Sequence, residues 1–220
     1  MEEAVEIEAG AIILEGRLAT PSAPTAGVAL CHPHPLYGGD MDNPVVARAA
    51  EVCQGAGLAT LRFNFRGVGQ SGGSHDRGEG EQEDVRGALA LLGKALAPAT
   101  PLGVIGHSFG AWVGSRVACT HDRVSGMVVI APPLAFYHFG FLRECRKTLL
   151  LVAGSRDPYC PRAEFEALTA GIPRAEARVI EGADHFFFGK LYPLGEAVAA
   201  WAHGFSEPGP GEAGRGRGAG

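Results

Sequence analysis

The stretch Val104-Ile105-Gly106-His107-Ser108-Phe109-Gly110-Ala111-Trp112 decides the fold of this chain. An apolar run from Gly103 to Ile105 leads into Gly-His-Ser-Phe-Gly, and the residues that follow are compatible with a helix. A strand, a sharp turn and a helix in this order are the context that a G-x-S-x-G motif requires. Gly106 and Gly110 leave room for the turn because they carry no Cβ. The pattern predicts that Ser108 Oγ stands free at the carboxyl end of a strand, in front of the N-terminus of a helix.

The composition is that of a globular protein with no electrostatic preference for nucleic acid. The 220 residues are 46% hydrophobic and 20% charged, and the formal net charge is −5. We predict one domain over residues 1–205 and a disordered tail over 206–220, which is rich in Gly, Pro, Glu and Arg. Neither nucleic acid nor a membrane is an expected partner, because the net charge is negative and no apolar run reaches the length of a membrane span. The oligomeric state is open between monomer and homodimer.

The cysteines and the N-terminus indicate the compartment. Five cysteines stand at unrelated spacings, and no Cys-x-x-Cys pair occurs. Cys31, Cys53 and Cys119 lie in apolar runs and are predicted to be small buried hydrophobic residues. The acidic start, Met1-Glu2-Glu3, lacks the basic and apolar regions of a signal peptide. Together these features predict a cytoplasmic protein.

Short apolar runs alternate with helical patterns along the chain. A hairpin is predicted for residues 5–9 and 11–19, and the further strands are 27–31, 58–65, 102–105, 126–131, 148–153 and 177–181. Helices are expected to begin at Asn43-Pro44, near Glu81, after Ser108 and at Pro161, and a last helix covers 194–205. The segment 32–39 is expected to be neither helix nor ladder strand, because of its prolines and glycines. Continuous apolar strands that alternate with helices predict a three-layer α/β/α sandwich around a mostly parallel sheet.

Two of the predicted strands are followed by ionisable residues. Asp157 follows the strand at 148–153, and His185 follows the strand at 177–181. Ligands of such sheets bind beyond the carboxyl ends of the strands, and Ser…Asp…His is the order of a catalytic triad in this architecture. We predict that His185 takes the proton of Ser108 and that Asp157 orients the imidazole.

Other residues near these three have ordinary explanations. Asp184 is adjacent to His185 and therefore poorly placed to orient it, and Asp122 lies one strand too early. His107 is expected to shape the turn around Ser108 and not to act as the base, because adjacent residues on such a turn point apart.

An acyl-transfer site also needs two N–H donors for the oxyanion. One is the N–H of the residue after the nucleophile, which is Phe109. The other is expected in the loop after the strand at 27–31. Pro33 and Pro35 have no N–H, so His34 is the favoured donor and Leu36 is the next candidate.

Two motifs resemble cofactor or metal sites but lack their context. Residues 67–72 match G-x-G-x-x-G, but a dinucleotide site needs a helix immediately afterwards, and a polar loop follows instead. His32 and His34 are separated by one residue, as metal ligands can be, but no nearby carboxylate or cysteine completes a three-ligand site. No cofactor and no metal are therefore predicted.

Several stretches taken together resemble those of the α/β-hydrolase superfamily. They are His32-Pro33-His34-Pro35 with Gly38-Gly39 and Met41-Asp42-Asn43, residues 64–72, residues 106–110 and residues 182–187. Over about residues 5–205 the chain is similar to short, single-domain bacterial members that are kin to dienelactone hydrolase-like and carboxylesterase-like proteins. The resemblance implies an eight-stranded, mostly parallel sheet with a serine–histidine–aspartate triad. The chain departs from larger superfamily members in one respect: only about residues 132–147 lie where those members carry a helical lid, so a minimal lid is predicted.

The resemblance does not determine the substrate, since dienelactone hydrolases proper use cysteine where this chain has Ser108. We predict that Leu36, Tyr37, Phe136 and Phe186 line an apolar pocket open to solvent. The hypothesis is a carboxylesterase or thioesterase that cleaves small-molecule esters or thioesters of short to medium acyl chain. An amidase or peptidase with the same triad and a catalytically silent hydrolase fold that binds proteins are the alternatives.

Overall fold

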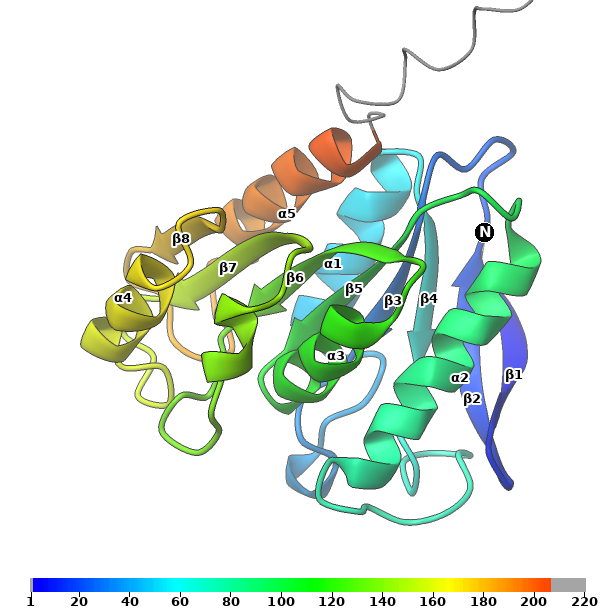
Figure 1. Ribbon diagram of the computed structural model, residues 1–220. Helices are drawn as coiled ribbons and strands as arrows, with labels where there is room; N and C mark the ends of the chain where they lie inside the picture. Colours follow the sequence, from blue (N-terminus) through cyan, green and yellow to red (C-terminus); the bar gives the residue numbers. More distant parts are fainter. Residues whose placement is uncertain (1, 207–220) are drawn as a thin grey trace, which may run out of the picture.

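The computed structural model describes residues 2–206, which form one twisted sheet between two layers of helices (Figure 1). The strands are β1 (Glu3–Ala9), β2 (Ile12–Ala19), β3 (Gly27–Cys31), β4 (Ala59–Phe63), β5 (Leu102–His107), β6 (Val124–Ile130), β7 (Thr148–Gly154) and β8 (Glu176–Ile180). The helices are α1 (Pro44–Gly55), α2 (Glu79–Ala95), α3 (Phe109–Thr120), α4 (Arg162–Ala170) and α5 (Leu191–Ser206), with short 3-10 segments η1 (Pro35–Tyr37) and η2 (Gly140–Arg143). Within residues 2–206, no helix is both long enough and apolar enough to span a bilayer.

The sheet has the strand order β1-β2-β4-β3-β5-β6-β7-β8. Only β1 with β2 and β2 with β4 pair antiparallel, and all other neighbours are parallel. Helices α1 and α5 pack together on one face, and α2, α3 and α4 cover the other (Figure 1). The predicted α/β sandwich with an eight-stranded, mostly parallel sheet is thus confirmed. Strand β5, which leads into Ser108, lies at the centre between β3 and β6.

The differences from the predicted elements are local. Strand β4 ends before Phe65 because the Phe65 N–H donates to His32 Nε2 (3.0 Å) and not to a neighbouring strand. Strand β6 begins at Val124, earlier than predicted, because Val124 pairs with Leu102 across a register shift. The segment after β3 does contain helix: His34 caps the η1 turn that follows it. The tail predicted over 206–220 lies outside the described residues, apart from Ser206, which ends α5.

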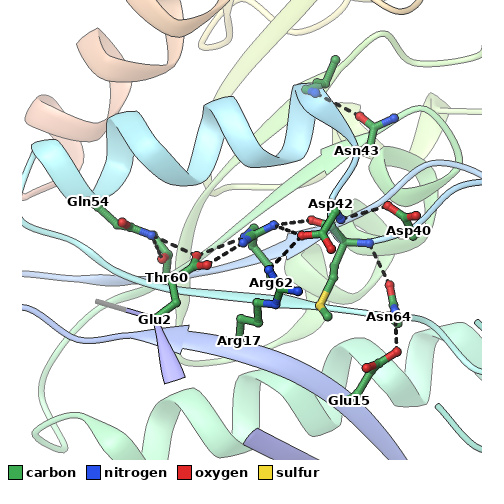
Figure 2. Close-up of polar contacts among 12 residues, drawn as sticks. Glu2, Glu15, Arg17, Asp40, Asp42, Asn43, Gln54, Thr60, Arg62 and Asn64 are labelled. Atoms are coloured by element: carbon green, nitrogen blue, oxygen red, sulfur yellow. Dashed lines mark hydrogen bonds and ion pairs between the residues drawn. The ribbon is translucent and has the colours of Figure 1, made fainter. Parts of the chain in front are cut away.

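A polar cluster holds the loop before α1 against β2 and β4 (Figure 2). Asn64 Oδ1 accepts the Met41 N–H (2.7 Å), and Asn64 Nδ2 donates to Glu15 Oε1 (2.7 Å). Arg62 donates to the Met41 carbonyl (2.7 Å) and pairs with Asp42 (2.9 Å). Residues of two of the stretches that resemble the hydrolase superfamily, 41–43 and 64–72, therefore hold each other in place.

The two glycines of the central motif lie where backbone segments approach most closely. A Cβ on Gly106 would lie 2.4 Å from the Gly110 carbonyl oxygen and 2.5 Å from Ala111 Cα. A Cβ on Gly110 would lie 2.3 Å from the Cys31 carbonyl oxygen. Because the opposing atoms belong to the backbone, no change of rotamer relieves these contacts.

We therefore expect Gly106→Ala to lower the midpoint of thermal unfolding (Tm) by about 5 °C or more, since overpacking costs roughly 1–3 kcal/mol or more. Gly204→Ala is the matched control, because Gly204 lies in α5 and, among residues 2–206, no atom outside its own helical turn lies within 4 Å of its Cβ position. Its Tm should stay unchanged or rise slightly, as alanine favours helix. Thermal unfolding followed by circular dichroism measures both. Equal Tm values for Gly106→Ala and the wild type would show that the turn can widen without loss.

Candidate active site

Ser108 occupies the turn between β5 and α3. Its φ of 56° and ψ of −119° form a strained conformation for a residue other than glycine. The surrounding backbone holds it there: the Ser108 N–H donates to the Ile130 carbonyl (2.9 Å), and the Ser108 carbonyl accepts from Ala111 (3.0 Å) and Trp112 (3.2 Å). An N-cap serine usually bonds its own helix, but the Ser108 hydroxyl makes no capping bond. Its Oγ is therefore available to a partner from another loop.

That partner is His185, and Asp157 lies behind it. Ser108 Oγ is 2.8 Å from His185 Nε2, and His185 Nδ1 is 2.7 Å from Asp157 Oδ2. Asp157 Oδ1 accepts the N–H groups of Tyr159 (2.8 Å) and Cys160 (3.1 Å), which turns the other oxygen toward the imidazole. All three side chains are buried. Because the carboxylate accepts from Nδ1–H, Nε2 faces the hydroxyl as an acceptor.

Hydrogen bonds within the loop after β8 fix the backbone that carries the His185 ring. Asp184 Oδ1 accepts the N–H groups of Phe186 (3.0 Å) and Phe188 (3.1 Å), so this rival carboxylate is used within its own turn. Phe187 is completely buried, with a positive φ of 56°, and anchors the loop in the core beneath α5.

His107 supports the same loop from β5. Its Nε2 lies 3.0 Å from the His185 carbonyl oxygen, to which it donates. Burial, and then the neighbouring His185, lower the pKa of His107 to about 3, so the ring is neutral in the folded protein. The two rings also lie 5.4 Å apart, but the hydrogen bond of His107 is to the backbone of His185 and leaves both ring nitrogens of His185 to Ser108 and Asp157. This geometry agrees with the interpretation that His107 shapes the site and is not the base.

His32 connects the loop after β3 with the loop after β4. Its Nδ1–H donates to the Pro33 carbonyl (2.6 Å), and its Nε2 accepts the Phe65 N–H (3.0 Å). Burial lowers the pKa of His32 to about 4, which keeps this bridge neutral. His32 is fully buried whereas His34 is partly exposed, so the two histidines of the His-x-His pattern lie in different environments.

The two predicted oxyanion donors are unengaged. Within residues 2–206, the backbone N–H groups of His34 and Phe109 donate to no acceptor. The Leu36 N–H, the other candidate, is taken by His34 Nδ1 (3.2 Å). The two donor segments are adjacent, because the His34 and Phe109 rings lie 4.8 Å apart.

The four predicted pocket residues are exposed around this site. The exposed fractions are 69% for Leu36, 87% for Tyr37, 67% for Phe136 and 48% for Phe186. The Phe186 ring meets that of His185 edge-on at 5.3 Å, and the Tyr37 ring lies 4.8 Å from that of His34. Leu36 is tied to the site by its backbone N–H, which donates to His34 Nδ1. These residues form a rim, which we call the apolar rim.

The sequence reasoning missed one aromatic neighbour of the site, Tyr159. The Tyr159 ring stands edge-on to His185 (4.9 Å) and lies 5.6 Å from Phe136, so it links Phe136 to the site. The Tyr137 ring stacks on Trp112 of α3 at 4.5 Å. The one sequence feature that could have predicted the contact of Tyr159 with His185 is its position directly after Asp157-Pro158.

His75 is a further missed residue, from the polar loop between β4 and α2. Its ring lies 4.8 Å from that of His34, and its Nδ1 lies 2.7 Å from the buried Glu81 carboxylate. Burial, and then His75, lower the pKa of His34. No pattern in the sequence predicts that His75 contacts His34. Their contact depends on how the loop after β3 and the loop after β4 fold over the carboxyl ends of the strands.

The sheet is mostly parallel and eight-stranded, and the serine stands in the strand–turn–helix after β5. The histidine and the aspartate that accompany it lie in the loops after β8 and β7. This arrangement defines the class of α/β hydrolases. Residues 28–191 match a family model described as alpha/beta hydrolase domain. The chain therefore belongs to the α/β-hydrolase family, and the predicted resemblance is confirmed.

Three relatives place it among short members. An alpha-beta serine hydrolase homologue from Coxiella burnetii has 34% identity and a TM-score of 0.84, over 90% of this chain and 96% of that chain. A serine hydrolase without lid from Xanthomonas campestris has 30% identity and a TM-score of 0.81, over 90% of this chain and 92% of that chain. An uncharacterised protein from Rickettsia prowazekii is 34% identical over 195 residues, which are 84% of this chain and 82% of that protein.

Proposed function

We propose that this protein hydrolyses carboxylic esters or thioesters of short to medium acyl chain through an acyl-Ser108 intermediate. The observation that carries the proposal is the buried, hydrogen-bonded series from Ser108 Oγ through His185 to Asp157, with distances of 2.8 and 2.7 Å. The serine has no capping bond to compete with this role. Such a series is what a hydroxyl needs to become a nucleophile near neutral pH.

The steps follow from these contacts. His185 Nε2 accepts the Ser108 proton as Oγ attacks the carbonyl carbon, and Asp157 stabilises the resulting imidazolium. The unengaged N–H groups of His34 and Phe109 donate to the oxyanion of the tetrahedral intermediate. The imidazolium then protonates the leaving alkoxide or thiolate. Water then attacks the acyl-enzyme by the same proton transfers, which releases the carboxylic acid and restores Ser108.

The apolar rim supports the assignment of substrate class. Between β6 and β7 only residues 131–147 are available, and they contain one short 3-10 segment, η2. An acyl chain can therefore lie along Phe136, Tyr159 and Phe186 without crossing a lid. An amide has a poorer leaving group and needs firmer positioning than these exposed side chains give, so an ester or thioester is favoured over an amide.

We propose residues 1–205 as one catalytic domain, because loops from along the described part of this range meet at the carboxyl ends of the parallel strands. A cytoplasmic location stays a prediction.

The test compares p-nitrophenyl esters from acetate to octanoate, the matching thioesters and the matching anilides. We expect turnover of esters and thioesters, no measurable turnover of anilides, and covalent labelling of Ser108 by a fluorophosphonate. Peptide mapping locates the label, and Ser115, buried on the same helix, is the internal control that should remain unlabelled. Anilide rates equal to ester rates would favour the amidase, and the absence of both labelling and turnover would favour the silent binding fold.

A further inference from the structure

Two thiols meet at the end of α3 that is remote from Ser108. Cys119 lies in the last turn of α3, and Cys145 follows η2. Their side chains are hydrogen-bonded to each other, and both are free thiols. The prediction that Cys31, Cys53 and Cys119 are small buried hydrophobic residues is therefore wrong for Cys119: the first two are completely buried, whereas Cys119 is partly exposed and has a thiol partner.

Both thiols line a surface cavity of about 470 Å³. Phe141 and the basic residues Arg86 and Arg116 also line it. A small oxidant can thus reach the sulfur atoms from solvent. Cys145 is itself a core residue with 4% exposure, but it lines this cavity, whereas Cys31 and Cys53 are 0% exposed and do not belong to the cavity lining.

The surroundings give the two thiols different reactivity. The hydrogen bond from Cys119 lowers the pKa of Cys145 most, and the Lys147 backbone N–H and the positive charges of Arg174 and Lys147 lower it further, against the effect of burial. The same pairing raises the pKa of Cys119. These directions favour Cys145 as the thiolate that attacks an oxidant and Cys119 as the protonated thiol that resolves the product.

We propose that Cys119 and Cys145 form a reversible disulfide when the protein meets hydrogen peroxide. The Cys145 thiolate attacks one peroxide oxygen, the O–O bond breaks and hydroxide leaves, which yields a sulfenic acid. The Cys119 sulfur then attacks the Cys145 sulfur, the S–S bond forms, and the oxygen leaves as water with the Cys119 proton. In total two thiols and one peroxide give one disulfide and two waters, and a dithiol reductant reverses the reaction by exchange.

The bond would tie the segment between β6 and β7 to α3 at a second place. The first is the stack of Tyr137 on Trp112. The segment also carries Phe136 of the apolar rim, so oxidation would fix part of the rim to the helix that begins at Ser108. Closing a loop between positions 119 and 145 restricts the unfolded chain, and we expect Tm to rise by about 5 °C or more.

The experiment uses the full chain, reduced and then treated with hydrogen peroxide. Tryptic digestion without reduction should yield the peptide Val117–Arg123 linked to Glu144–Arg146, Tm should rise, and dithiothreitol should reverse both changes. Cys119→Ser should accumulate a Cys145 sulfenic acid that dimedone traps. Cys53→Ser is the matched control, and it should oxidise as the wild type does, because Cys53 is completely buried on α1.

The proposal is overturned if both thiols of the oxidised wild type still react with an alkylating agent, or if the disulfide joins two chains on a non-reducing gel. Peptide mapping of the wild type needs no variant, so a folding defect in Cys119→Ser does not obscure the result. None of these measurements depends on ester hydrolysis, so the outcome is independent of the role proposed for Ser108.

Discussion

Ser108→Ala is expected to lower kcat for a p-nitrophenyl ester by about 10⁴-fold or more, as loss of the nucleophile does in other serine hydrolases. The substitution removes the Oγ that lies 2.8 Å from His185 Nε2 and leaves the imidazole with no hydroxyl to deprotonate. KM should change little, because the hydroxyl is a small part of the surface that meets the substrate. Steady-state kinetics on purified protein provide the measurement, with the wild-type active sites titrated by a fluorophosphonate and the variant normalised to its protein concentration.

Ser115→Ala is the matched control for this prediction. Ser115 lies on the same helix and is buried, but its Oγ donates to the Trp112 carbonyl (3.2 Å) and to no other group in the part of the chain that the structure describes. We expect its kcat to stay within about threefold of the wild type, because the hydroxyl touches none of the three site residues. Should Ser108→Ala keep kcat within about tenfold of the wild type, the acyl-serine mechanism would be excluded.

Asp157→Asn is expected to lower kcat by about 10³- to 10⁴-fold with little loss of fold. Both carboxylate oxygens are acceptors here: Oδ2 from His185 Nδ1–H, and Oδ1 from the N–H groups of Tyr159 and Cys160. An amide has only one oxygen. If its NH₂ faces His185, the imidazole must take the tautomer whose Nε2 carries a proton, and it can no longer accept from Ser108. If the NH₂ faces the two N–H groups instead, buried donors oppose one another.

Asp184→Asn tests whether any neighbouring carboxylate would serve. Asp184 precedes His185 directly, but it uses only Oδ1, which accepts from Phe186 and Phe188. Asparagine keeps that oxygen, so kcat should stay within about threefold of the wild type. The Tm of Asp157→Asn and that of Asp184→Asn are compared with the wild-type Tm to show that the fold is intact. A larger loss of kcat in Asp184→Asn than in Asp157→Asn would reassign the acid.

Much of the site was predictable because its determinants are local in the sequence. The turn at Ser108 needs glycine on both sides, and the distances from Gly106 and Gly110 to the facing backbone show why. Asp157 and His185 each follow an apolar run, and the carboxyl ends of parallel strands meet at one edge of a sheet. His34 could be selected because the prolines beside it have no N–H.

The chain by itself thus determined the alternation of buried strands and helices, the serine turn and the loops that carry ionisable groups. The tertiary structure alone decided which distant side chains meet: Tyr159 on His185, His75 beside His34, and the Cys119 thiol against Cys145. The physical reason is that periodicity and turn residues report the burial and conformation of neighbours in sequence. Contacts between loops depend instead on the strand order and on the way each loop crosses the sheet edge, which are set by the packing of the whole core.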